Sequence, residues 1–309
     1  MFAIITDDMT MKIDWLKGCA TALVTPFKSD LNLDENCFRR LVERQIEGGI
    51  KLLVPCGTTG ESVTMTEAER LRVIEISVEV ARRKNARVIA GVGSNNTAAT
   101  VEFTKKAKQL GADAALVVAP YYNKPTQEGL YQHFKAIANS QPDLPMMLYN
   151  VPGRTSSNIS AQTTLRLAED CQNVVATKEA SGNFTQLIEI VRGKSADFAV
   201  FSGDDASTIP LIALGADGLV SVASNEIPEL MCEMTAAALT GNFIKAREIH
   251  YHIFPLVEGN FIESSPAPLK FVMSEMNLLS EVLRLPLVPV TESSRQVLRK
   301  VLADLNLTR

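Results

Sequence analysis

Eight short apolar runs alternate along the chain with longer stretches whose apolar residues recur at helical spacing. The runs that we expect to form strands cover residues 20–24, 51–55, 87–91, 114–119, 145–149, 174–178, 198–201 and 218–222. The helical stretches between them cover residues 34–47, 66–84, 97–110, 127–139, 160–169, 183–192 and 206–214. The strands are too continuously apolar to expose one face to water, which is typical of a parallel sheet covered by helices. The pattern therefore predicts an α/β fold, a closed (β/α)8 TIM barrel, with an open doubly wound sheet as the alternative.

The alternation stops near residue 225, and the rest of the chain carries only helical patterns. They cover residues 228–239, 243–257, 266–276 and 293–305. No linker-like or low-complexity run separates them from the barrel, so we expect this region to pack on the barrel rather than to form an independent module. The predicted organisation is an N-terminal extension at residues 1–17, a barrel at residues 18–224 and a C-terminal helical region at residues 225–309.

Several predicted helices carry signals at their ends. Thr66 and Glu69 have the spacing of a capping box at the start of the second helix. Gly111 and Gly215 each follow an apolar-periodic run, where a residue in the left-handed conformation often ends a helix. These signals support the helix assignments independently of the apolar spacing.

The composition excludes several classes of protein. Of the 309 residues, 46% are hydrophobic and 21% are charged, so the chain can bury a large core and is not of the disordered class. The net charge is −4 without any block of Lys or Arg, which argues against nucleic acid as a partner. No apolar run approaches the roughly 20 residues that cross a bilayer, and residues 1–17 lack the pattern of a secretory signal. We therefore expect no membrane partner and a cytoplasmic location.

Neither the cysteines nor the histidines form a pattern typical of a metal site. The five cysteines are odd in number and include no Cys-x-x-Cys pair, which argues against a disulfide framework and a zinc thiolate site. His133 lies within a helical pattern, and His250 and His252 are two residues apart, on different faces of a helix. We expect reduced cysteines, no metal ion and no catalytic histidine.

The carboxyl ends of the strands are where a barrel of this kind carries its reactive side chains. The second predicted strand ends in the turn Gly57-Thr58-Thr59-Gly60-Glu61, whose glycines allow backbone N–H groups to approach a small anion. The turn is a candidate site for a carboxylate or a phosphate, although Gly-Thr turns also occur as ordinary loops. Its spacing does not match a nucleotide-binding P-loop.

Two further strand ends carry residues that can act on a carbonyl group. Lys178 ends the sixth strand, where desolvation favours the neutral amine that forms a Schiff base. The alternative is a lysine that reaches solvent or pairs with Glu179. Tyr149 ends the fifth strand and can transfer protons if a hydroxyl lies within reach, although a tyrosine with a buried ring and a solvated hydroxyl is also common. Asp204 and Asp205 follow the seventh strand, and we expect them to cap the next helix.

Five motifs occur in a fixed order along the chain. They are Gly57-Thr58-Thr59-Gly60-Glu61, Tyr121-Tyr122-Asn123, Tyr149-Asn150-Val151-Pro152-Gly153-Arg154-Thr155, Lys178-Glu179-Ala180-Ser181-Gly182 and Ser202-Gly203-Asp204-Asp205. In order and spacing the chain resembles the dihydrodipicolinate synthase family of the pyruvate-dependent class I aldolase superfamily, from about Gly18 onward. The resemblance implies a lyase that condenses pyruvate with L-aspartate 4-semialdehyde, the first committed step toward diaminopimelate and lysine, without a cofactor.

The resemblance also implies roles for individual residues. Lys178 would form an imine with the keto carbon of pyruvate and so make the methyl group acidic. Thr58 and Thr59 would hold the pyruvate carboxylate, mainly through backbone N–H groups. Tyr149 would transfer protons through the Thr58 hydroxyl to Tyr122 of a neighbouring subunit, which requires an oligomer; the family suggests a homotetramer built as a dimer of dimers. Two further positions would line the pyruvate pocket with their backbones, Gly203 and Val220.

Arg154 bears on the second substrate. A semialdehyde brings a carboxylate that a guanidinium binds bidentately, whereas a neutral sugar aldehyde gives an arginine no such role. The resemblance places Arg154 where the synthases bind that carboxylate. Two alternatives remain open: a pyruvate-dependent Schiff-base aldolase or dehydratase that acts on a sugar acid, and a keto-acid binding or regulatory protein without turnover. The second is disfavoured because binding alone needs neither an imine-forming amine nor a proton relay.

The resemblance extends to a feedback site with one departure. Lysine-inhibited members of the family bind lysine at positions that match Ser62, Val63, Glu67, Arg70, Asn95, Ala99 and Tyr121. Those members have an acidic residue where this chain has Ala99, and Arg70 adds a charge of the same sign as the lysine ammonium. We expect weak or absent inhibition by lysine.

Overall fold

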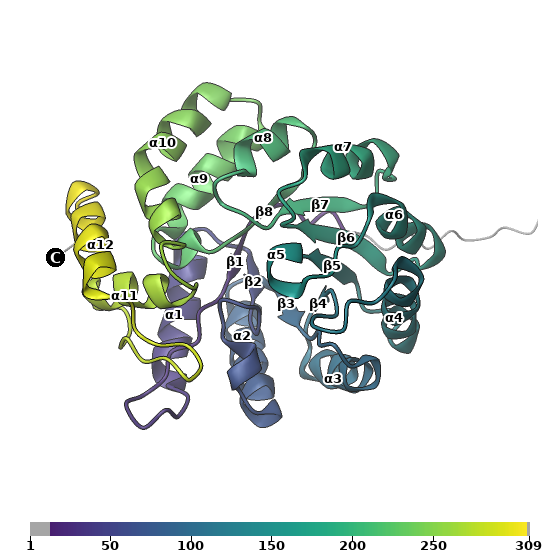
Figure 1. Ribbon diagram of the computed structural model, residues 1–309, viewed down its shortest axis with the longest axis horizontal. Coiled ribbons are helices and arrows are strands. Elements are labelled where there is room, and N and C mark those ends of the chain that lie inside the picture. Colours follow the sequence, from purple (N-terminus) through teal and green to yellow (C-terminus); the bar gives the residue numbers. More distant parts are fainter. Residues whose placement is uncertain (1–12, 308–309) are drawn as a thin grey trace, which may run out of the picture.

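The computed structural model describes residues 13–307, in which eight parallel strands close into a barrel (Figure 1). The strands are β1 (Gly18–Ala22), β2 (Leu52–Val54), β3 (Arg87–Gly91), β4 (Ala114–Val118), β5 (Met146–Asn150), β6 (Val174–Glu179), β7 (Ala199–Ser202) and β8 (Gly218–Ser221). Each strand pairs with its neighbours in sequence, and β1 pairs with β8. This closure confirms the predicted (β/α)8 barrel and excludes the open sheet.

Helices surround the barrel and follow the strands in turn (Figure 1). They are α1 (Glu35–Glu47), α2 (Glu67–Arg83), α3 (Thr97–Leu110), α4 (Gln127–Ser140), α6 (Ala161–Asp170), α7 (Phe184–Gly193), α8 (Thr208–Ala213) and α9 (Pro228–Leu239). The sequence patterns assign α9 to the C-terminal region. In the structure α9 packs against β1 and α8, so it completes the ring around the barrel.

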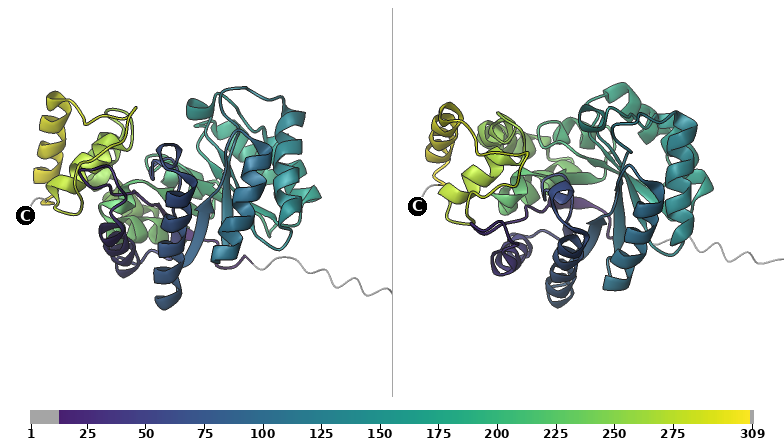
Figure 2. Two further views of the ribbon diagram at one scale, coloured as in Figure 1. Left: turned by 90° about the horizontal axis from the view of Figure 1, so that it is seen from below. Right: turned by 60° about the horizontal axis from the view of Figure 1, so that its bottom comes forward.

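The remaining C-terminal helices lie outside this ring, on the side of α1 (Figures 1 and 2). They are α10 (Phe243–Gly259), α11 (Ala267–Glu275) and α12 (Glu292–Asp304). α10 packs on α9 and α8, and α12 packs on α10 and α11. Three single-turn elements interrupt the loops: η1 (Ser62–Thr64), α5 (Pro152–Thr155) and η2 (Ala223–Asn225).

The predicted helix ends are confirmed at several positions. The Thr66 side chain accepts a hydrogen bond from the backbone of Glu69, and the Glu69 carboxylate accepts one from the backbone of Thr66, which is a complete capping box at the start of α2. Gly111 ends α3 with a φ of 94°, and Gly215 adopts a φ of 108° just after α8. Both glycines take the left-handed conformation that side chains resist.

Two apolar layers form the core. One fills the barrel interior and includes Leu52, Ile89, Met147 and Phe201. The other lies between the strands and the surrounding helices, where the side chains of Phe38 and Phe134 are completely buried. Because the interior is packed with side chains, a ligand can reach the barrel only at its ends, and the carboxyl ends of the strands are the end where loops and reactive residues gather.

The five cysteines are unpaired, and four of them are buried. Within residues 13–307, no helix is both long enough and apolar enough to span a membrane.

Candidate active site

A cavity of about 160 Å³ opens at the carboxyl ends of the strands. We call it the site cavity. Its wall includes Thr58 and Thr59 from the loop after β2, Tyr149 from β5, Lys178 from β6 and Gly203 from the end of β7. The structure therefore brings together residues that are up to 145 positions apart in the sequence, as the alternation of strands and helices predicts.

Lys178 is buried in the wall of the site cavity, with only 5% of its surface exposed. The strand register places it directly beside Tyr149, and its Nζ lies 4.3 Å from the centroid of the tyrosine ring. No carboxylate of the described residues lies within ion-pair distance of Lys178, whereas the other buried lysine, Lys270, is paired with Glu61. An amine in such a position is accessible to a small substrate and is not neutralised by an acid.

The carboxylate of Glu179 does not pair with Lys178. It accepts hydrogen bonds from Asn150 Nδ2 at 3.1 Å, from the backbone N–H of Ser181 at 2.7 Å and from Gln186 Nε2 at 3.1 Å. These neutral donors satisfy a buried acid without a cation. The alternative in which Lys178 serves only as the partner of Glu179 is therefore excluded by the geometry.

Gly203 provides the space that the Lys178 side chain occupies. A Cβ atom at this position would lie 2.7 Å from Cβ of Ala180 and 2.9 Å from Cε of Lys178. Both distances are shorter than van der Waals contact, so a larger residue would displace the lysine. The glycine is thus required by packing next to the reactive amine.

The turn after β2 is suited to bind an anion. Cys56 and Glu61 flank it in the left-handed conformation, with φ values of 59° and 52°. The Glu61 N–H donates to the Thr58 carbonyl at 3.0 Å, while the backbone N–H groups of Thr58 and Thr59 have no recorded acceptor among the described residues. Free N–H groups at the wall of a cavity favour a carboxylate ligand.

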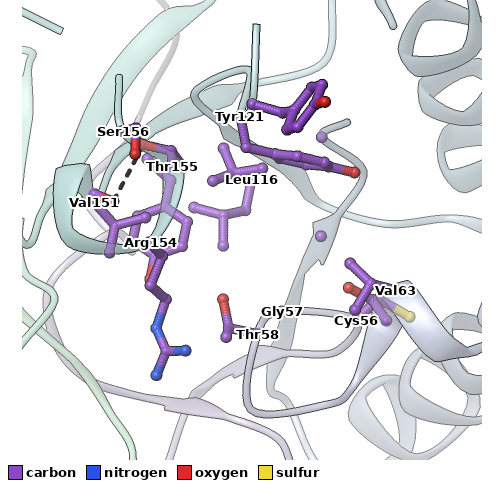
Figure 3. Close-up of a pocket in the computed structure, with 16 residues that line it drawn as sticks. Cys56, Gly57, Thr58, Val63, Leu116, Tyr121, Val151, Arg154, Thr155 and Ser156 are labelled. Carbon is purple, nitrogen blue, oxygen red and sulfur yellow. Dashed lines mark hydrogen bonds between the residues drawn. The ribbon is translucent and has the colours of Figure 1, made fainter. Parts of the chain in front are cut away.

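Arg154 lies on α5, immediately after β5, and lines the site cavity. Its side chain is exposed and extends from α5 beside Thr58 (Figure 3). None of the acidic residues in the part of the chain that the structure describes forms an ion pair with it. The guanidinium is therefore free to bind a second anionic group next to the first.

A second, larger cavity of about 490 Å³ shares Thr58, Tyr149 and Arg154 with the site cavity (Figure 3). Tyr121 and Tyr122 also line it. The Tyr122 side chain is 88% exposed and its backbone has a φ of 77°, which is unusual for a bulky residue. The described residues of this one chain do not enclose the Tyr122 phenol, so it is available to a neighbouring molecule.

Positions that correspond to the lysine-binding residues are also found at this larger cavity. Ser62, Val63 and Tyr121 line it, whereas Ala99 is exposed on α3. Arg70 stacks on Phe103, with its Cζ 3.8 Å from the ring centroid. Weak inhibition by lysine stays a prediction.

The residue after β8 contributes to the site cavity, while the lining role expected of the Val220 backbone stays a prediction. Val220 is completely buried in the barrel interior, and the residue after β8 that lines the site cavity is Val222. Two residues of the loop between α10 and α11, Phe261 and Ser265, also line it. No strand-end signal marks those two positions, because they belong to the region where the strand and helix alternation has stopped.

The prediction that Asp204 and Asp205 cap the following helix is wrong, because the residue at the start of α8 is Ser207 and no side chain caps the helix. Asp205 has a different role. Its carboxylate is buried and accepts hydrogen bonds from the N–H groups of Val222 at 2.9 Å and Ala223 at 3.1 Å, and burial raises its pKa. Asp204 lies in the loop before α8, where it accepts from the Ala206 N–H at 3.3 Å and from the Ser207 hydroxyl at 2.8 Å. Asp205 therefore fixes the loop after β8 instead of a helix end.

Comparison with known proteins gives a consistent result over nearly the whole chain. The model of the dihydrodipicolinate synthetase family matches residues 15–305. A 4-hydroxy-tetrahydrodipicolinate synthase of Chloroherpeton thalassium is 50% identical over 292 residues, which are 94% of this chain and 96% of that protein. The corresponding protein of Koribacter versatilis is 51% identical over 290 residues, with 94% and 96% covered.

Solved structures agree with these relatives. The dihydrodipicolinate synthase of Aquifex aeolicus superimposes with a TM-score of 0.92 at 44% identity and covers 94% of this chain and 99% of that chain. The structure from Cyanidioschyzon merolae with lysine bound has a TM-score of 0.92 at 44% identity, with 94% and 98% covered.

Proposed function

The chain belongs to the dihydrodipicolinate synthetase family, and we propose which of its residues carry out the reaction. It is a lyase that condenses pyruvate with L-aspartate 4-semialdehyde to 4-hydroxy-tetrahydrodipicolinate, the first committed step of diaminopimelate and lysine biosynthesis. One observation supports the assignment of residues more than any other: Lys178 is buried at the site cavity with no carboxylate partner among the described residues.

Lys178 supplies the nucleophile. Its neutral Nζ attacks the keto carbon of pyruvate, water leaves, and a protonated imine forms. The positive imine nitrogen withdraws electrons from the methyl group, which loses a proton to give an enamine. The enamine carbon then attacks the aldehyde carbon of the semialdehyde. Finally, the semialdehyde amine attacks the imine carbon, which closes the ring and releases Lys178.

Thr58 and Thr59 orient pyruvate in this scheme. Their free N–H groups bind its carboxylate, so the keto carbon is held within reach of Lys178, which lines the same cavity. Binding by backbone groups on a fixed turn costs little reorganisation when the substrate arrives. Gly203 keeps the path of the lysine side chain open.

Tyr149 transfers the protons of imine formation and ring closure. It is buried beside Lys178 and shares the cavity wall with Thr58, whose hydroxyl would connect it to Tyr122 of a neighbouring subunit. The exposure of Tyr122 in the single chain supports this arrangement, since the phenol needs a second molecule to be enclosed. We include a homotetramer, a dimer of dimers, in the proposal.

Arg154 binds the carboxylate of the semialdehyde. It is free of ion pairs among the described residues and lies beside Thr58, so the two carboxylates of the reaction have separate sites. A cytoplasmic location completes the proposal, because five unpaired cysteines suit a reducing compartment.

The decisive test compares the wild type with Lys178→Ala. Consumption of pyruvate with aspartate semialdehyde is measured with a coupled reductase, and pyruvate is trapped on the enzyme with borohydride and located by mass spectrometry. We expect the variant to lose more than about a thousandfold in kcat and to trap no pyruvate. Lys105→Ala, on the outer surface of α3, is the matched control and should behave as wild type.

Other outcomes would change the assignment. Wild-type enzyme that traps pyruvate on Lys178 but does not consume semialdehyde would be an aldolase or dehydratase for a sugar acid. Wild-type enzyme that neither traps pyruvate nor turns over would be a keto-acid binding protein.

A further inference from the structure

The turn that faces pyruvate ends in a buried acid. Glu61 follows Gly60 directly, only 1% of its surface is exposed, and its carboxylate forms an ion pair with Lys270 of α11. Both side chains are completely shielded from solvent. The C-terminal region thus reaches a residue that adjoins the substrate-binding turn.

Lys270 makes its other contacts with structural groups. Its Nζ also donates to the carbonyl of Val282 at 2.8 Å and lies 4.3 Å from the ring centroid of Phe27. Burial lowers its pKa, while Glu61 opposes that shift. Two charges in such surroundings stabilise each other, and removal of one leaves the other uncompensated.

A second cation from the C-terminal region contacts the same place. The backbone N–H of Arg284 donates to Glu61 Oε2 at 3.4 Å, and its guanidinium donates to the carbonyl of Thr64 at 3.0 Å. The guanidinium also forms an ion pair with Glu69, in the capping box of α2, and lies 4.2 Å from the Phe27 ring centroid. Lys270 therefore holds the end of the turn, and Arg284 holds the segment that follows it.

The turn has few contacts of its own that could fix its position. Within it, the Glu61 N–H donates to the Thr58 carbonyl, and from outside, Thr25 Oγ1 donates to the carbonyl of Gly60 at 2.8 Å. Glu61 is held in the left-handed conformation, which is unfavourable for a residue with a side chain. Something must hold it there, and the buried carboxylate is the group that is anchored.

We propose that Lys270 and Arg284 are positioning residues for pyruvate, which fix the N–H groups of Thr58 and Thr59 at the site cavity. Lys270 acts through the carboxylate of Glu61, and the Arg284 guanidinium acts through the carbonyl of Thr64. Neither cation lines the cavity or touches the reacting atoms. A small displacement of the turn would weaken the binding of the pyruvate carboxylate while the site of Arg154 stays in place. This inference rests on the proposed function, in which Thr58 and Thr59 bind that carboxylate.

The test compares Lys270→Met with a matched variant of the same region. Arg295→Met breaks the Arg295–Glu281 ion pair, which joins α12 to the loop before it and is also largely buried, without a contact to the turn. KM for each substrate, kcat and the rate of borohydride trapping at low pyruvate are measured well below the melting temperature of each protein. For Lys270→Met we expect KM for pyruvate to rise about tenfold and trapping to slow equally, with KM for the semialdehyde within about twofold of wild type. Arg295→Met should leave both KM values unchanged.

A second variant covers the case in which Lys270→Met fails to fold. Glu61→Gln combined with Lys270→Met removes both charges and so avoids an uncompensated one. We expect this protein to fold and to keep the raised KM for pyruvate, and Lys270→Arg to restore most of the wild-type value. A folded variant without the Glu61–Lys270 pair but with wild-type KM for pyruvate and wild-type trapping would overturn the inference. An equal rise in KM for pyruvate in Arg295→Met would also overturn it. Wild-type enzyme that traps no pyruvate would instead overturn the proposed function beneath it.

Discussion

Two lysines are buried among residues 13–307, and their surroundings assign them different chemistry. Lys270 forms an ion pair with Glu61 and donates a hydrogen bond to a carbonyl. These contacts stabilise its ammonium form, which cannot act as a nucleophile. Lys178 faces a cavity and contacts only the face of the Tyr149 ring with its Nζ, so loss of its proton breaks no ion pair. The residue that can become a nucleophile is the one without a carboxylate partner among the described residues.

Arg154 tests the choice of the second substrate. In Arg154→Ala the semialdehyde carboxylate loses its charged partner, and we expect KM for the semialdehyde to rise by about 100-fold, as a charge-assisted bidentate contact of roughly 3 kcal/mol implies. KM for pyruvate and the trapping of pyruvate on Lys178 should change little. Steady-state kinetics with each substrate varied in turn measures both effects.

Arg154→Lys is the matched control, because it keeps the charge but not the bidentate geometry. It should fall between wild type and Arg154→Ala. Equal loss for both substrates in Arg154→Ala would mean that the arginine supports the fold of α5 and not the recognition of the semialdehyde.

Individual site residues could be predicted where they break a pattern. Lys178 and Tyr149 end apolar strands, so their polar groups are conspicuous in sequence. The link between Glu61 and Lys270 could not be predicted, because Lys270 lies in a helical pattern and its partner is more than 200 positions earlier. The role of Asp205 was missed for a related reason: an acid before a helix is normally a cap, and only the tertiary structure brings the loop after β8 within its reach.

At the scale of elements, apolar spacing predicted all eight strands and the helices between them, with ends that differ by a few residues at most. The strands are easy to find because both faces of a parallel barrel are buried and each strand is one continuous apolar run. The single-turn elements α5 and η2 could not be predicted, since neither is long enough to show a period. α5 carries Arg154, so the element that was missed is one that presents a site residue.

The contact between α3 and α4 predicts a pH dependence of stability. His133 on α4 is buried, its Nδ1 lies 2.9 Å from Oγ1 of Thr97 at the start of α3, and burial lowers its pKa from 6.5 to about 4. Between these two values the unfolded chain binds a proton that the folded chain does not. The stability that the neutral form of His133 contributes is therefore fully present above pH 6.5 and is lost as the pH falls toward 4.

Urea unfolding at one chain concentration measures this effect. Between pH 8 and pH 5 we expect wild type to lose about 2 kcal/mol more of its free energy of unfolding than His133→Gln, which cannot titrate. The glutamine variant is the comparison because its amide can still bond to Thr97. Parallel losses for the two proteins would show that His133 does not titrate in this way.

At the scale of the whole molecule, the position of Tyr122 predicts that two inactive variants can complement each other. Lys178→Ala and Tyr122→Ala chains, mixed under conditions in which subunits exchange, form sites with Lys178 from one chain and Tyr122 from its neighbour. Random pairing makes half of the dimers mixed with one complete site each, so we expect about a quarter of wild-type activity.

Each variant alone, incubated and assayed identically, provides the baseline. Mixing Lys178→Ala with Tyr149→Ala is the negative control, because both residues belong to the same chain's half of the site. Each site of such a mixed dimer lacks one of the two residues, so we expect no recovery of activity. No recovery with either mixture, although the subunits exchange, would assign Tyr122 to its own chain.

The ion pair between Glu61 and Lys270 also bears on the order in which the molecule is made. A ribosome adds roughly 5–20 residues per second, so the acid at the end of the substrate-binding turn emerges about 10 to 40 seconds before the lysine that neutralises it. Arg284 follows later still, 223 residues after Glu61. During that interval the turn lacks the lysine that pairs with Glu61, and the segment after it lacks Arg284, even after every strand of the barrel has been synthesised. The proposed pyruvate site is therefore among the last parts of the nascent chain to acquire its final form. A truncated product that ends after β8 would contain Lys178 without the residues that support the turn after β2.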